Sequence, residues 1–135
     1  MQYTDAFKKL GYRLSSPRQD WSAGKTDGVC ISIWRNELDR TGDFLRYDLW
    51  ALHPNPQWAT WMSKPGQRTR TAHLQRVMDE FGGKVDVVLV TGKPGESYES
   101  AEPWLIEKRG AGWRIIRFEP TNGYFISEVD ARSKS

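Results

Sequence analysis

The run Val-Asp-Val-Val-Leu-Val at residues 85–90 constrains the fold more than any other feature of the sequence. It is apolar at almost every position, so a strand built from it carries apolar side chains on both faces. Such strands are stable only where both faces are covered, which is the situation of a central strand in a layered domain. The run therefore predicts the middle of a sheet with packed material on either side of it.

The segment before this run has the periodicity of an amphipathic helix. Its apolar residues follow the spacing i, i+3, i+4, i+7: Leu74, Val77, Met78 and Phe81. We expect a helix from about residue 67 to Phe81, ended by the Gly82-Gly83 pair, that buries this stripe against the strand at 85–90. The residues expected to face away from the stripe are Arg68, Gln75, Arg76 and Asp79.

A second, shorter helix is predicted at the start of the chain. The same spacing recurs there in Tyr3, Ala6, Phe7 and Leu10. Thr4 is placed to cap this helix and Gly11 to end it.

Alternation of apolar and polar residues predicts the strands. Residues 29–34 and 45–51 alternate, and their short polar connection favours an antiparallel hairpin. Residues 104–108, 113–119 and 124–129 predict three further strands, whereas residues 91–101 are expected to form a polar loop.

One domain accommodates all of these elements, because 135 residues suffice for a single core. The sequence thus predicts a single α+β domain over residues 1–130, with a frayed tail at 131–135. Its sheet would be mixed or mostly antiparallel, with about six strands and two helices.

Cysteine usage and hydropathy indicate a cytoplasmic protein. Cys30 is the only cysteine, so no internal disulfide can form, and its apolar surroundings predict a buried, reduced thiol. No apolar run approaches the length of a membrane span, and the first residues lack the basic and apolar regions of a secretory signal. No membrane partner is therefore expected, and the oligomeric state is left open.

The sequence contains no recognisable catalytic, cofactor or metal motif. Gly92-Lys93-Pro94-Gly95 lacks the spacing of a phosphate-binding loop and is interpreted as a turn. His53 and His73 have no metal-ligand spacing around them, and no serine occupies a nucleophile elbow. One enzymatic alternative survives, a metal-dependent hydrolase built on acidic residues near the strands: Glu37, Asp39, Asp43, Asp48 and Asp86, with Lys84.

Basic and aromatic residues favour binding over catalysis. The net charge is +3, yet residues 6–19 and 49–78 contain no acid at all. Cationic side chains contact phosphates and aromatic rings stack on bases, so this pattern suits a nucleic acid. The candidate nucleic-acid-binding residues are Arg18, Trp21, Trp34, Arg35, Lys64, Arg68 and Arg76.

The seven tryptophans need not all contribute to such a surface. We expect Trp34, Trp50 and Trp104 to pack against the sheet, whereas Trp58 and Trp61 are adjacent to Lys64 in the sequence. Trp21 is the best candidate for a functional ring, because it lies in the polar loop at residues 17–28, where binding residues concentrate. In the alternative interpretation, Trp21 caps the sheet and Arg18 pairs with an acid.

The pattern Leu-x-Ser-Pro-Arg-x-x-Trp-Ser-Ala at residues 14–23, with the later Trp34-Arg35-Asn36-Glu37, resembles a small bacterial domain. That domain occurs alone or attached to HNH-type endonucleases. The segments at residues 70–74, 91–94 and 123–125 also fit. The chain has no HNH residues, so the resemblance implies a DNA-associated module without cleavage activity, with Arg18, Trp21, Trp34 and Glu37 at matching positions.

Three functions follow in order of preference. The first is a non-catalytic DNA-binding module. The second is an interaction factor from a mobile element that binds a defence or repair protein complex, and the third is the metal-dependent hydrolase.

Overall fold

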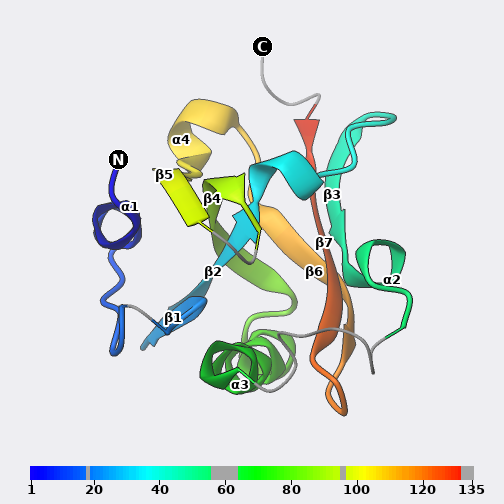
Figure 1. Ribbon diagram of the computed structural model, residues 1–135, viewed down its shortest axis with the longest axis horizontal. Coiled ribbons are helices and arrows are strands. Elements are labelled where there is room, and N and C mark those ends of the chain that lie inside the picture. The colour runs from blue at the N-terminus through cyan, green and yellow to red at the C-terminus, as the bar shows by residue number, and fades with distance from the viewer. Residues whose placement is uncertain (18, 56–63, 95–96, 132–135) are drawn as a thin grey trace.

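A computed structural model describes residues 1–17, 19–55, 64–94 and 97–131 (Figure 1). Within these residues one sheet contains seven strands, and four α-helices accompany it. The elements are α1 (Tyr3–Lys9), β1 (Ser22–Lys25), β2 (Gly28–Trp34), the 3-10 turn η1 (Arg35–Glu37), β3 (Phe44–Asp48), α2 (Leu49–Leu52), α3 (Pro65–Glu80), β4 (Lys84–Lys93), β5 (Ser97–Pro103), α4 (Ile106–Arg109), β6 (Trp113–Glu119) and β7 (Tyr124–Asp130). The predicted α+β class is confirmed.

Strand β4 is the centre of the sheet, as its two-sided apolar run predicts. The strand order is β1-β2-β4-β6-β7-β3, and β5 also pairs with β4. Val85, Val87 and Leu89 point into the core beneath α3, whereas Val88 and Val90 belong to a second core that includes residues of α1. One strand therefore joins both cores, with α1 and α3 on different sides of it (Figure 1).

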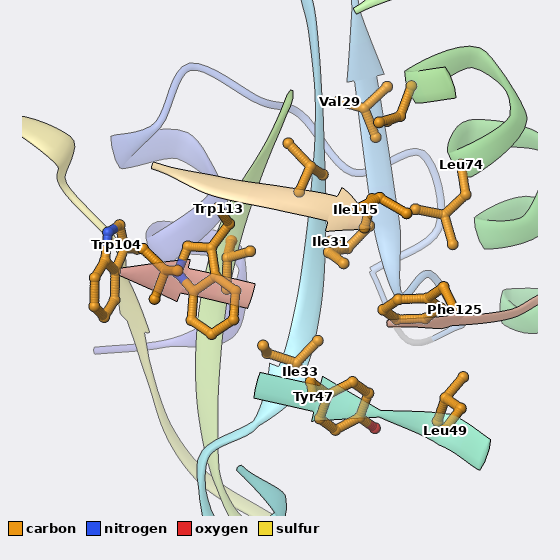
Figure 2. Close-up of a cluster of buried hydrophobic side chains, with 14 of the residues drawn as sticks. Val29, Ile31, Ile33, Tyr47, Leu49, Leu74, Trp104, Trp113, Ile115 and Phe125 are labelled. Carbon is orange, nitrogen blue, oxygen red and sulfur yellow. The ribbon is translucent and has the colours of Figure 1, made fainter. Parts of the chain in front are cut away.

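The larger core gathers side chains from most of the chain (Figure 2). Leu74 and Val77 of α3 are fully buried in it, as the helical spacing predicts. Met78 is 39% exposed, so the prediction that it joins the buried stripe is wrong, and Phe81 is only partly buried. The helix is turned so that the more N-terminal Arg70, rather than Met78, extends the buried face.

The predicted hairpin between residues 29–34 and 45–51 is wrong. Strand β2 pairs in parallel with β4, from Cys30 opposite Asp86 to Trp34 opposite Val90, and β3 pairs with β7 instead. The physical reason is that β2 is buried on both faces, which requires a neighbour in the middle of the sheet. Helix α3 lies between β2 and β4 in the sequence and provides the crossover that a parallel pair needs.

The segment predicted as a loop at residues 91–101 is mostly strand. Strand β4 continues to Lys93, and β5 returns antiparallel to it, with a register shift at Thr91/Gly92. Described side chains of β5 before Ala101 are exposed, so the strand lacks the apolar alternation that sequence analysis relies on. The strand predicted at residues 104–108 is also wrong, because α4 (Ile106–Arg109) begins within it and is capped by Gly110, whose φ is +85°.

Of the remaining predictions, which concern the two ends of the chain, some are confirmed and others are not. Helix α1 forms as expected and Gly11 follows it with φ +91°, but Gln2 rather than Thr4 lies at the N-cap position, and its side chain makes no capping hydrogen bond. Strands β6 and β7 and the turn between them match their predicted positions. Most of the predicted tail, residues 132–135, lies outside the described residues, and the amide of Ala131 still donates to Asp43. No helix in the described parts of the chain is long and apolar enough to cross a membrane.

Candidate functional site

The predicted binding residues fall into two groups in the fold. Trp21, Lys64 and Arg68 lie around the first turns of α3, whereas Trp34 and Arg35 lie where β2 ends. Arg18, Trp58 and Trp61 lie outside the described residues.

Trp21 is held against the start of α3. A Cβ atom on Gly66 would come within 2.8 Å of the indole ring, so the helix and the ring are in direct contact. The guanidinium of Arg70 lies 4.9 Å from the centre of the same ring. Trp21 is therefore a partly buried residue that packs against the start of α3. Lys64 and Arg68 on the same helical turns are exposed.

Arg70 is a buried arginine that sequence analysis did not select. Its guanidinium lies between the rings of Trp21 and Phe125, at 4.9 and 5.0 Å from their centres. Burial lowers the pKa of Arg70 from its usual value, while the nearby phenols of Tyr47 and Tyr3 act in the opposite direction. A signal was present, because Arg70 precedes Leu74 by one helical turn and so lies on the buried stripe. The arrangement is a cation–π stack within the core.

His73 and Ser22 form a contact between α3 and β1. The Ser22 hydroxyl lies 2.6 Å from Nδ1 of His73, and burial lowers the pKa of this imidazole. A serine beside a histidine invites a nucleophilic interpretation, but Ser22 is only 1% exposed and no substrate could reach it. The pair instead seals β1 onto α3, next to Gly24, where a Cβ would lie 3.2 Å from His73 Nε2.

Arg76 is likewise part of this helix–strand contact. Its Nε donates to Glu80 at 3.2 Å and a terminal nitrogen donates to the carbonyl of Thr26 at 2.8 Å. The guanidinium also lies over the ring of Phe81. Arg76 thus fastens the end of α3 to the turn between β1 and β2.

The second group, Trp34 and Arg35, lies at a cavity that we call the strand-end cleft. Strands β2 and β4 are parallel, so their carboxyl ends, at Trp34 and after Val90, reach the same edge of the sheet. The cleft has a volume of about 310 Å³ and is lined by Arg35, Asn36, Arg40, Thr91 and Gly92. Ligands of open α/β sheets commonly bind outside the carboxyl ends of parallel strands.

The two arginines of the cleft differ in their surroundings. Arg35 forms an ion pair with Glu102 of β5, and the same carboxylate binds Arg109 at 2.9 Å. Arg40 is exposed and makes no ion pair with any of the described residues. The cleft therefore offers one neutralised and one available guanidinium.

Hydrogen-bonding groups complete the lining. The amide nitrogen of Asn36 donates to the carbonyl of Gly92 at 3.4 Å, and the hydroxyl of Thr91 lies 2.8 Å from that of Ser100. Both bonds are exposed, so water or a ligand can replace them at little cost. Trp34 lies beside the cleft but packs against the core that includes α1 residues, as expected for this ring.

Sequence analysis missed four of the five cleft residues: Asn36, Arg40, Thr91 and Gly92. Arg35 was selected because it follows a tryptophan at the end of a strand. The other four come together only because β2 and β4 are parallel, and the erroneous hairpin concealed that arrangement.

A second hollow lies at the opposite, amino ends of β2 and β4. Its volume is about 640 Å³, and acidic and basic side chains mix in its lining, including Asp27, Glu80, Asp86 and Lys84. Burial raises the pKa of Tyr12, and so does the hydrogen bond of 2.7 Å that its phenol donates to Asp86. The carboxylates make this hollow a poorer anion site than the strand-end cleft.

The acidic residues proposed for a hydrolase are dispersed. Asp48 accepts hydrogen bonds from the amides of Trp50 and Ala51 and so caps α2. Asp39 accepts from Thr41, and these bonds lower its pKa. Among the described residues, no group of three potential ligands is placed to hold a metal ion.

Comparisons with protein-family models, curated proteins and solved structures find no match for this chain. The resemblance to an HNH-associated bacterial domain therefore remains a prediction.

Proposed function

We propose that the protein binds nucleic acid, with DNA as the first candidate, through the strand-end cleft and without catalysis of its own. The observation that carries the proposal is the pair Arg35 and Arg40 in one cleft at the carboxyl ends of two parallel strands. Guanidinium groups bind phosphate with two parallel hydrogen bonds, which makes arginine the common choice for such contacts.

The rest of the cleft suits the same ligand. Asn36 and Thr91 supply neutral donors beside the two cations, and a phosphodiester presents two unesterified oxygens to such groups. The positive net charge of the chain adds a weaker, long-range attraction. Lys64 at the start of α3 is a second exposed cation, and it serves to test whether binding extends beyond the cleft.

The test is the salt dependence of DNA binding, measured by fluorescence anisotropy. Each phosphate contact contributes about one unit to the slope of log K against log salt. We expect Arg40→Ala to weaken binding and reduce that slope by about one unit, because Arg40 is exposed and makes no described ion pair. The melting temperature should remain nearly unchanged.

The matched control is Lys84→Ala, which removes one exposed positive charge from the other end of β4. A smaller effect of Lys84→Ala than of Arg40→Ala supports the cleft. Equal losses in both variants would mean that binding follows net charge alone. Absence of binding at low salt would end the nucleic-acid proposal.

No specific observation favours either of the two alternative functions. The exposed large apolar side chains within the described residues are spread over different elements, with Met78 on α3, Tyr98 on β5, Ile106 on α4 and Ile116 on β6. Co-purification of a protein partner tests the interaction factor, and turnover that depends on a divalent metal tests the hydrolase.

A further inference from the structure

Glu102 already forms an ion pair with Arg35, one of the two arginines in the strand-end cleft. It lies on β5 opposite Leu89 of β4, and its side chain is 50% exposed. One carboxylate oxygen binds Arg35 and the other binds Arg109. An incoming anion must therefore displace Glu102 from Arg35 or share the guanidinium with it.

When an anion displaces Glu102 from Arg35, Glu102 still has one ion-pair partner. Arg109 remains bound to its second oxygen, and the guanidinium of Arg109 is held over the buried ring of Trp104, 4.7 Å from the ring centre. Half of the Glu102 side chain already faces solvent, so release from Arg35 leaves no carboxylate buried without a partner. The Arg35–Glu102 pair is thus an exchangeable contact rather than a fixed one.

Charge decides which anion makes this exchange. An internal phosphodiester carries one negative charge, the same as the carboxylate it would replace, so like is exchanged for like at Arg35. A phosphate monoester carries between about 1.5 and 2 negative charges near neutral pH and has three terminal oxygens. Its additional charge and oxygen can engage Arg40 while it also displaces Glu102 from Arg35.

We propose that the strand-end cleft selects a phosphate monoester, the terminal phosphate of a nucleic-acid strand, over internal phosphodiesters, and that Glu102 lowers the affinity for either anion by competing for Arg35. The inference rests on the proposed function and narrows it to strand ends. The selectivity comes from the additional charge and oxygen of the monoester at Arg40, whereas Glu102 acts on every anion that binds Arg35.

The experiment compares two oligonucleotides of identical sequence, one with a 5′-phosphate and one with a 5′-hydroxyl, by anisotropy at fixed salt. The wild-type protein should bind the phosphorylated strand about tenfold or more tightly, the effect of one additional charge-assisted hydrogen bond. Glu102→Gln keeps the shape of the side chain and removes its charge. This variant should strengthen binding of both strands, because neither strand then has to displace a carboxylate from Arg35, and the preference for the phosphorylated strand should remain.

Glu99→Gln is the matched control, because Glu99 is an exposed glutamate on the same strand and forms no described ion pair. It should raise both affinities less than Glu102→Gln does, because it removes the same charge without releasing Arg35. Arg40→Ala should reduce the ratio between the two affinities, by weakening binding of the phosphorylated strand more. Melting temperatures of all variants show that the fold is retained.

The outcomes separate the two proposals. Equal wild-type affinity for both strands would overturn the selectivity and leave nucleic-acid binding standing, whereas no binding of either would overturn both. Affinities that Glu102→Gln raises no more than Glu99→Gln does would overturn the role of Glu102. A mononucleotide that competes as well as the phosphorylated strand would support the monoester site but identify a free nucleotide, rather than a strand end, as its ligand.

Discussion

The two faces of β4 are covered in different ways. The face towards α3 belongs to the larger core, to which β2, β3, β6 and β7 all contribute side chains (Figure 2). The other face belongs to a smaller core under α1, a helix of 7 residues. Helix α3 has 16 residues and packs on the larger core, so its face carries more of the burial that stabilises the fold.

The faces also differ in how they are closed at their borders. The α3 side is closed by contacts between helix and strand, including Ser22 with His73. The α1 side is closed by phenol groups, since Tyr3 donates to the carbonyl of Asp20 at 2.8 Å and Tyr12 donates to Asp86. A helix as short as α1 is not stable alone, so it depends on these anchors and on Phe7. The comparison indicates a global role for the α3 face and a local one for the α1 face.

The largest expected effect is on the α3 face. Leu74→Ala should lower the free energy of unfolding by about 2–5 kcal/mol, because Leu74 is fully buried between α3 and the sheet. Met78→Ala, one turn further along the same helix, should change it by less than about 0.5 kcal/mol, because Met78 is on the exposed side. Denaturant melts measure both variants, and comparable losses would contradict the orientation of α3.

A smaller effect is expected on the α1 face. Tyr12→Phe removes the hydrogen bond to Asp86 and should cost about 0.5–1.5 kcal/mol. Because this anchor is local, amide exchange should accelerate in α1 and its following turn while α3 remains protected. Uniform acceleration over both helices would show that the two faces unfold together and would remove the distinction drawn between them.

Local patterns were sufficient to predict the elements that bury one continuous stripe. The spacing of Leu74 and Val77, the two-sided run at residues 85–90 and the alternation in β6 and β7 all led to correct elements. Pairing was not predictable in the same way, since nothing local in residues 29–34 shows that their neighbour is β4, reached only after α3. Strand β5 was not predicted, because its exposed polar residues have the composition of a loop.

The candidate site shows the same difference between local patterns, which were predictable, and strand pairing, which was not. Trp34 and Arg35 were found because they adjoin each other at a strand end, but the cleft depends on the parallel pairing that brings Thr91 and Gly92 beside them. Arg70 was missed for a different reason. A charged residue is not expected inside a core, and the rings of Trp21 and Phe125 stabilise its position there.

The smallest expected effect concerns the border of the α3 face and depends on pH. His73 contacts Ser22, with Arg76 and Asp20 as its charged neighbours, and burial outweighs Asp20 to lower the pKa of the imidazole from its usual 6.5. The unfolded chain therefore takes up a proton at a higher pH than the folded one does. The stabilisation is complete above the unfolded pKa and is lost as the pH falls below about 6.5 towards the lowered folded value.

His73→Gln keeps a polar group at this position without a titrating ring, so the difference in stability between wild type and variant should shift against the wild type on acidification. Thermal melts from pH 7.5 to 5 measure this difference. A difference that does not vary with pH would show that the α3 face tolerates a charged His73, and its border would then be looser than the contact with Ser22 implies.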